Sequence, residues 1–175
     1  NGYSAQTNLI GAYNLENIMA AACVGSHFGV DMPTIVSALE NYKPSNNRSQ
    51  FISTSSNKLI VDAYNANPTS MKAALDNFIS LKSDSEKALI LGDMLELGKD
   101  SEAEHRKIVE MIAASGIKKV MLVGQNFASV AKNGMSTFKN VDELIPVLTD
   151  NKLNGCLILI KGSNSMKLTK VVEYL

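Results

Sequence analysis

The segment from Val61 to Leu75 constrains the fold more than any other part of this chain. An apolar run with β-branched residues, Leu59 to Val61, leads into the polar and turn-prone residues 62–67. Asn67 then suits a helix cap, and Pro68 suits the first helical position, where its missing N–H costs nothing. Apolar residues beyond Pro68 recur at spacings of three and four, which predicts one buried helix face. A strand that leads through an acid and two amides into a helix is typical of the places where α/β proteins carry their chemistry.

Two further junctions of this kind follow along the chain. Residues 88–91 form an apolar run that reaches Asp93 after one glycine, and residues 157–160 lead directly into Lys161. Parallel strands with covering helices end at a common edge of their sheet. We therefore expect the polar groups of all three junctions to converge at that edge.

The order of the elements predicts an α/β fold with a Rossmann-like, doubly wound and mostly parallel sheet of about six strands. Strands are expected near residues 50–55, 59–63, 88–92, 118–123, 136–138 and 156–161. Helices are expected near residues 68–81, 100–115, 126–132, 141–150 and 166–175. Only a short polar turn separates the first two strands, so they should form a hairpin that gives the sheet one antiparallel edge.

Two helices are predicted ahead of the sheet, at residues 14–28 and 32–42, and no strand accompanies them. Residues 43–50 are polar and rich in helix breakers, which is typical of a linker. We therefore expect residues 1–43 to be the last helices of a preceding domain and residues 44–175 to form one complete α/β domain. The chain begins without Met, so we also expect it to be a portion of a longer protein.

The composition excludes several classes of function. Basic and acidic residues balance at 17 each, so the chain lacks the electrostatic character of a nucleic-acid or anionic-membrane binder. With 45% hydrophobic residues it should form a full core. Its longest apolar runs are far shorter than the roughly 20 residues that span a bilayer. Cys23 and Cys156 both lie in apolar surroundings, which predicts buried free thiols and a cytoplasmic location.

Several widespread catalytic and binding motifs are absent from the sequence. Neither a Gly-x-x-x-x-Gly-Lys-Ser/Thr loop nor a Gly-x-Gly-x-x-Gly fingerprint occurs, so any nucleotide must be held mainly by something else. His27 and His105 have no Cys or His partners at metal-ligand spacing, and no serine occupies a nucleophile elbow. We predict no metal site and no catalytic triad, and we interpret both histidines as structural or solvated.

The polar residues near the junctions are candidate ligand-binding groups. Asp62 ends a buried strand, which favours a ligand contact over loop capping. Lys161 precedes a Gly-Ser pair at a helix entrance, which favours binding of a carboxylate or a phosphate. Asn65 and Asn67 suit turns and caps equally well, and Arg48 suits either solvent or a phosphate clamp that closes with domain motion. The apolar loop after the third strand is either packed locally or a mobile lid.

Five segments of the chain, taken in order, resemble the Mur ligases of peptidoglycan synthesis. They are residues 9–22, the Arg48 linker, and residues 61–75, 89–98 and 157–166. The resemblance implies that ATP phosphorylates the terminal carboxylate of a UDP-N-acetylmuramoyl-tripeptide, and that the amine of D-alanyl-D-alanine attacks the resulting acyl phosphate. It further implies that a central ATPase domain, ending in residues 1–43, holds most of the ATP and Mg²⁺, and that this chain alone is inactive.

The resemblance also implies roles for individual residues. Nucleotide contacts are implied for Asn14, Asn17, Arg48 and Asp62. Contacts with D-alanyl-D-alanine are implied for Tyr64, Asn65, Asn67, Asp93, Glu96, Lys161 and Ser163. Three positions depart from the family pattern. Tyr13 stands where a His is frequent, Ala63 stands where a Ser is common, and Asn164 stands where an Arg is common. The expected partners are small molecules, with no nucleic acid and no membrane span, and the expected state is a monomer.

Two other interpretations of the same residues stay open. Asp62, Asp93 and Lys161 at successive strand ends imitate the pocket of a phosphoacceptor receiver domain, although Val61 stands where a second early acid is needed. A non-catalytic binding module that keeps only the substrate face is the other alternative.

Overall fold

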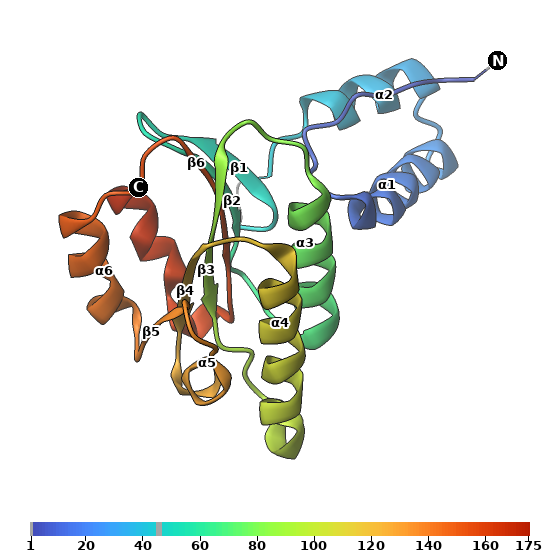
Figure 1. Cartoon of the computed structure of the whole chain (residues 1–175). Helices are drawn as coiled ribbons and strands as arrows, with labels where there is room; N and C mark the ends of the chain where they lie inside the picture. The colour runs from blue at the N-terminus through green and yellow to red at the C-terminus, as the bar shows by residue number, and fades with distance from the viewer. Residues whose placement is uncertain (1, 45–46) are drawn as a thin grey trace.

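The computed structural model of the chain describes residues 2–44 and 47–175 (Figure 1). Ser45 and Asn46 of the predicted linker lie outside the described residues. The strands are β1 (Gln50–Ser53), β2 (Lys58–Asp62), β3 (Glu86–Gly92), β4 (Lys119–Val123), β5 (Ser136–Phe138) and β6 (Cys156–Lys161). They form one sheet in the order β1-β2-β6-β3-β4-β5, in which β1 and β2 are antiparallel and every other neighbouring pair is parallel. The predicted α/β class and the antiparallel edge are confirmed.

The helices follow the predicted order, with one difference at the end of the chain. The α-helices are α1 (Leu15–His27), α2 (Met32–Asn41), α3 (Pro68–Ser80), α4 (Ser101–Ser115), α5 (Gln125–Val130) and α6 (Val141–Asp150). The 3-10 helices are η1 (Ala12–Asn14), η2 (Gly98–Asp100), η3 (Asn164–Met166) and η4 (Leu168–Tyr174). The helix predicted near residues 166–175 is the 3-10 helix η4, which begins at Leu168, because Lys167 adopts a left-handed conformation, with φ of 53°, that separates η3 from η4.

Apolar side chains cover the sheet on both faces. In the central strand β6, Leu157 and Leu159 belong to one cluster, whereas Ile158 and Ile160 belong to the other, because neighbouring side chains on a strand point to opposite faces. Helices α3, α4 and α5 complete the first cluster, and α6 and η4 complete the second (Figure 1). Burial on both faces explains why the parallel strands are continuous apolar runs in the sequence.

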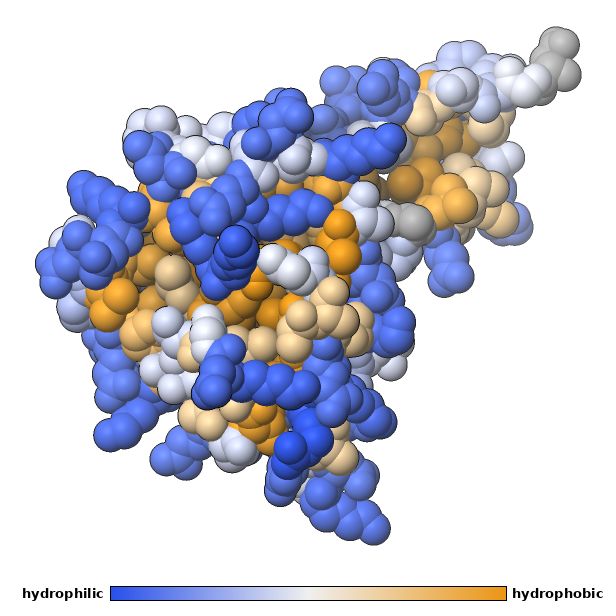
Figure 2. Space-filling model, viewed as in Figure 1, coloured by the Kyte–Doolittle hydropathy of each residue, from blue (hydrophilic) through white to orange (hydrophobic). Residues whose placement is uncertain are grey.

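The first two helices stand beside the sheet rather than on it (Figure 1). They pack against each other, and among their described residues only Ile35 is buried. Apolar side chains of α1 such as Leu15 and Met19 are exposed, and Figure 2 shows apolar surface over this part of the molecule. Cys156 is buried as predicted, but the prediction for Cys23 is wrong: its thiol is exposed, because this face of α1 has no packing partner among the described residues.

The start of α3 fixes the position of the loop that precedes it. The Asn67 side chain accepts a hydrogen bond from the Ser70 backbone N–H at 2.8 Å, and the Ser70 hydroxyl accepts one from the Asn67 N–H at 3.1 Å. This reciprocal capping box, with Pro68 at the first helical position, confirms the predicted helix start. Among the residues that the structure describes, no helix combines the length and apolar character that a membrane crossing needs.

Candidate functional site

The polar ends of the central strands meet at one edge of the sheet, as the sequence predicts. Asp62 at the end of β2 pairs in register with Lys161 at the end of β6, and Lys161 also pairs with Leu91 of β3. Beyond β3, the Asp93 carbonyl accepts a hydrogen bond from the Ser163 N–H at 3.2 Å. The three junctions are therefore in direct contact.

Lys161 lies inside this edge rather than on its surface. Its side chain is 2% exposed, and its ammonium donates to the Asp62 Oδ2 at 2.7 Å and to the Asn65 carbonyl at 3.0 Å. An ammonium shielded from water is stable only with such acceptors nearby. The cation predicted to meet a substrate carboxylate or phosphate is thus already paired with an acid of the chain.

The second oxygen of Asp62 connects the sheet to the linker. Asp62 Oδ1 accepts a hydrogen bond from the Ser49 N–H at 3.2 Å, and the Ser49 hydroxyl lies 2.7 Å from the Tyr13 hydroxyl. Burial raises the pKa of the Tyr13 hydroxyl, the hydrogen bond with Ser49 lowers it by less, and the nearby Asp62 carboxylate raises it further. A continuous polar chain therefore joins the segment before α1 to the end of β2.

Ser49 is a residue that the sequence patterns did not identify. It is buried and adopts a left-handed conformation, with φ of 50°. A serine beside an arginine in a polar linker carries no distinguishing signal, because its role depends on Tyr13 and Asp62, which are distant in sequence.

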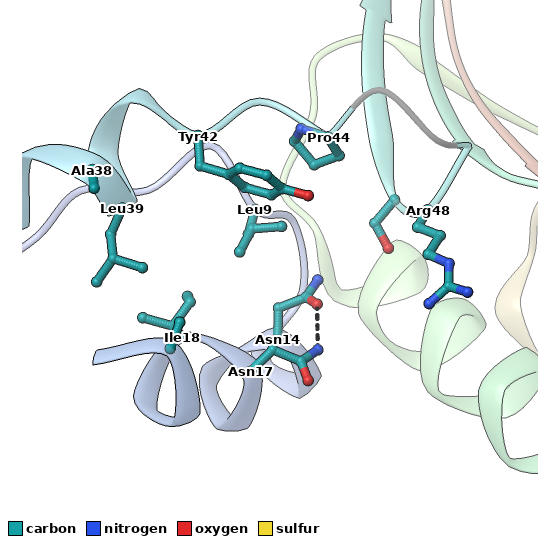
Figure 3. A pocket seen from close by; sticks show the side chains of 11 residues that line it. Leu9, Asn14, Asn17, Ile18, Ala38, Leu39, Tyr42, Pro44 and Arg48 are labelled. Carbon is teal, nitrogen blue, oxygen red and sulfur yellow. Dashed lines mark hydrogen bonds between the residues drawn. The ribbon is translucent and has the colours of Figure 1, made fainter. Parts of the chain in front are cut away.

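A pocket of about 500 Å³ lies between α1, α2 and the linker (Figure 3). Its lining comprises Leu9, Asn14, Asn17, Ile18, Ala21, Ala38, Leu39, Tyr42, Pro44, Arg48 and Ser49. The Asn14 amide donates to the Ile10 carbonyl at 2.7 Å, and its oxygen accepts from the Asn17 amide at 3.1 Å. Asn14 is buried, with one hydrogen bond to its amide nitrogen and one to its oxygen, whereas Asn17 is exposed. The pocket thus combines an apolar lining with polar groups at its ends, which suits a small organic ligand.

Arg48 lies at the linker end of this pocket, away from Ala38 and Leu39 of α2 (Figure 3). Its guanidinium carbon lies 4.0 Å from the centre of the Tyr64 ring, which is a cation–π contact. Tyr64 belongs to the loop after β2, so the stacking joins the linker to that loop. Three of the four residues predicted to contact a nucleotide therefore line one pocket, and the fourth, Asp62, connects to it through Ser49.

Asp93 has a different environment from Asp62, although both follow apolar strands. Its side chain is 5% exposed, and its two oxygens accept hydrogen bonds from the backbone N–H groups of Asn126 and Phe127, each at 2.9 Å. The carboxylate thereby caps the start of α5. Gly124 permits this arrangement, because a Cβ there would overlap the carboxylate and its φ of 119° disfavours other residues.

The loop after Asp93 begins with a buried residue, Met94, so this part of the loop packs against the domain. Met94 is fully buried, and its N–H donates to the His105 Nε2 at 3.0 Å. His105 Nδ1 lies 2.7 Å from the Ser101 carbonyl, so Nδ1 carries the proton and the ring is a buried structural group. Further along, the Leu95 N–H donates to the Ser163 hydroxyl at 3.1 Å.

The remaining predicted dipeptide contacts divide by exposure. Tyr64, Asn65 and Glu96 have exposed side chains, and Glu96 adopts a left-handed conformation, with φ of 64°. Asn67 is engaged as the cap of α3, and Ser163 is buried but keeps its own hydroxyl proton for a further bond. Within residues 2–44 and 47–175, no group of three or more His, Cys, Asp or Glu side chains is placed to hold a metal ion.

Comparison with known proteins identifies the family. Residues 47–164 match the family described as Mur ligase, glutamate ligase domain. The UDP-N-acetylmuramoyl-tripeptide--D-alanyl-D-alanine ligase of Bacillus subtilis (strain 168) is 36% identical over an alignment of 174 residues, and the match covers 94% of this chain but 38% of the relative. A crystal structure of MurF from Acinetobacter baumannii has a TM-score of 0.83 at 29% identity, covering 97% of this chain and 39% of that one. MurF ligase from Thermotoga maritima in complex with ADP has a TM-score of 0.77 at 20% identity, covering 95% of this chain and 38% of that one. The resemblance seen in the sequence is confirmed, and the chain belongs to the Mur ligase family.

Proposed function

We propose that the full-length protein carrying this chain is an ATP-dependent amide ligase that joins D-alanyl-D-alanine to a UDP-N-acetylmuramoyl-tripeptide in peptidoglycan synthesis. The observation that carries the proposal is the pocket that gathers Asn14, Asn17 and Arg48, in a chain 36% identical to a ligase named for this reaction. ATP would phosphorylate the tripeptide's terminal carboxylate and leave as ADP. The dipeptide's amine would then displace phosphate and form the amide.

The chain spans 38% of the Bacillus subtilis relative, so the proposed reaction is divided between domains. We assign residues 1–43 to the end of a central ATPase domain and residues 44–175 to a C-terminal domain. The separation of α1 and α2 from the sheet supports this division. We also assign the reaction to the cytoplasm, where ATP is available.

The nucleotide half of the proposed site uses the pocket beside the linker. Asn17 presents an exposed amide, which suits the donor and acceptor edge of adenine. Arg48 offers a planar set of donors that suits phosphate oxygens. The Asp62 carboxylate, at the end of β2, suits ribose hydroxyls. The structure of the Thermotoga maritima relative with ADP supports a nucleotide ligand for this fold.

Among the described residues, no group of three or more His, Cys, Asp or Glu side chains is placed to hold a metal ion, and Mg²⁺ beside ATP takes most of its ligands from phosphates and water. We therefore assign Mg²⁺ to the central domain, together with the ATP phosphates. The roles proposed for residues of this chain are contacts with the nucleotide and with the dipeptide, and they involve no metal ion.

The dipeptide half uses the edge where the three strand junctions meet. Tyr64, Asn65 and Glu96 are exposed there, and we assign contacts with D-alanyl-D-alanine to them. Ser163 adds a hydroxyl proton that suits a carboxylate oxygen. Asp93 acts by holding α5 and the following loop, since both of its oxygens are bonded to backbone N–H groups. The same bonds occupy both oxygens of Asp93, which is one of the two acids at which the phosphoacceptor alternative would place its phosphate.

The test is a reaction of the full-length protein in which each substrate is omitted in turn. Amide product is measured by mass and ADP by a coupled assay. We expect product only when ATP, UDP-N-acetylmuramoyl-tripeptide and D-alanyl-D-alanine are all present. Replacing the dipeptide by glutamate or by single D-alanine should abolish the amide. Product with glutamate in place of the dipeptide, or no amide with any amine, would contradict the proposal.

A further inference from the structure

We propose that Lys161 is a positioning residue that ties the nucleotide side of the site to the dipeptide side, and that it does not bind the dipeptide's carboxylate. This inference rests on the proposed ligase function and refines one residue of it. The starting observation is that Lys161 is among the largest fully buried side chains of the described molecule. A charged side chain in that position needs a structural explanation.

Two acceptors of the chain itself surround the Lys161 ammonium. The Asp62 carboxylate at 2.7 Å neutralises its charge, and the Asn65 carbonyl at 3.0 Å takes a second proton. A hydrogen bond between a charged ammonium and a charged carboxylate is short and strongly oriented. Both oxygens of Asp62 are thereby held, one by Lys161 and the other by the Ser49 N–H.

These two acceptors belong to different halves of the site. Asp62 is the carboxylate assigned to the ribose, whereas Asn65 lies in the loop assigned to the dipeptide. Tyr64, the neighbour of Asn65, supports the Arg48 guanidinium with its ring. One buried ammonium therefore fixes Asp62 directly and Arg48 through the loop, and it sets their positions relative to the dipeptide side.

The burial of Lys161 excludes direct binding of a substrate carboxylate. Its side chain is 2% exposed, and the residue ends a central strand of the sheet, between Asp62 on β2 and Leu91 on β3. A carboxylate that reached the ammonium would have to displace Asp62 and enter the interior without water. Desolvation of a second anion beside Asp62 is strongly unfavourable.

The test compares Lys161→Met with Lys170→Met in the full-length ligase. Lys170 is a matched control, because its side chain is half exposed and its ion pair with Asp142 lies on the surface. We expect Lys161→Met to raise the KM for ATP by about tenfold, in line with the loss of one charged hydrogen bond. Lys170→Met should leave it unchanged. A rise in the KM for D-alanyl-D-alanine alone, with normal ATP kinetics, would overturn the proposal.

A double substitution tests whether Lys161 acts through Asp62. In an Asp62→Asn background, Lys161→Met should change the KM for ATP by about twofold at most, because the ion pair is already lost. An undiminished tenfold effect in that background would contradict the proposed role. If Lys161→Met does not fold, Lys161→Arg replaces it. In Lys161→Arg, the KM for ATP should again change more than the KM for D-alanyl-D-alanine. A larger change in the KM for D-alanyl-D-alanine would contradict the proposal.

A second readout does not depend on the reaction. Hydrogen exchange followed by mass spectrometry measures protection of the linker near Ser49 and of residues 63–67. We expect exchange in both segments to be several-fold faster in Lys161→Met and unchanged in Lys170→Met. Unchanged protection in Lys161→Met would overturn the positioning role. If the unmodified protein forms no amide, the proposed function fails, and this exchange measurement still decides the role of Lys161.

Discussion

At the scale of single residues, the site is a set of side chains that position one another. The hydroxyl of Tyr13 lies at one end of the polar chain that continues through Ser49 and Asp62 to Lys161. Partial burial disfavours the phenolate, and the Asp62 carboxylate adds repulsion, so the pKa of Tyr13 is raised above its usual 10.0. The protonated hydroxyl is thus the form that holds the linker to the segment before α1.

This environment predicts the alkaline behaviour of Tyr13. Because the folded state holds the proton more tightly than the unfolded chain, the contribution of Tyr13 to stability is complete below pH 10.0 and is lost as the pH rises through its raised pKa. Phenolate absorbance during an alkaline titration should show a late step that Tyr13→Phe removes. The exposed Tyr3 is the control, and Tyr3→Phe should leave that step in place. A late step that survives in Tyr13→Phe would contradict the assignment.

Arg48 and Asp62 are the residues whose loss should affect nucleotide use most. In the full-length protein, Arg48→Ala and Asp62→Ala should each raise the KM for ATP by about tenfold or more, since charged donors and acceptors to the ligand are removed. Their matched controls are Arg106→Ala and Asp142→Ala, which remove exposed charges on α4 and α6. Steady-state kinetics with normal ATP dependence in both site variants would show that these roles are wrongly assigned.

At the scale of elements, the start of α5 depends on a residue from another junction. Asp93 supplies two acceptors to the first turn of this short helix, and Gly124 provides the space for its carboxylate. The cap therefore joins the ends of β3 and β4, and it orients the loop that carries Glu96.

Removal of this cap should destabilise the folded protein. Asp93→Ala leaves two N–H groups of α5 without acceptors, so we expect the free energy of unfolding to fall by about 2–4 kcal/mol. Asp100→Ala is the control, because Asp100 precedes α4 but its side chain makes no capping hydrogen bond. Chemical denaturation of the two variants measures the difference. Equal stability would show that the Asp93 bonds contribute little.

The elements could be predicted from the sequence because their signals are local. Apolar runs with polar ends marked the strands, and Asn67 with Pro68 marked the start of α3. The partners of the strand-end residues could not be predicted, because they come from distant segments. Asp62 and Asp93 have the same local pattern, yet one bonds Lys161 and the linker while the other caps α5. The pocket depends in the same way on the placement of α1 and α2 against the linker.

At the scale of the whole molecule, the residues of this chain form one part of the proposed site. The first helix exposes apolar side chains such as Leu15, Met19 and Val24. The sequence contains no Gly-x-x-x-x-Gly-Lys-Ser/Thr loop to hold the phosphates of ATP. Nucleotide contacts from this chain are therefore expected to complement others made by the proposed central domain.

This division predicts that residues 1–175 alone are inactive. We expect the isolated chain neither to hydrolyse ATP nor to form the amide, because its proposed contacts position the nucleotide and the amine but supply no phosphate cradle. Phosphate release and product mass are measured with all three substrates present, beside the full-length protein as a positive control. Turnover by the isolated chain would contradict the division of the site.

The central claim is that the pocket lined by Asn14, Asn17 and Arg48 receives the nucleotide, and its most direct test is the affinity for ADP. Calorimetry compares the full-length protein with Asn17→Ala and with Asn41→Ala, which removes an exposed asparagine of α2 outside the pocket. Loss of hydrogen bonds to the base should raise the Kd of Asn17→Ala about 5- to 30-fold, and Asn41→Ala should bind normally. Equal affinity of Asn17→Ala and the unmodified protein would contradict the claim.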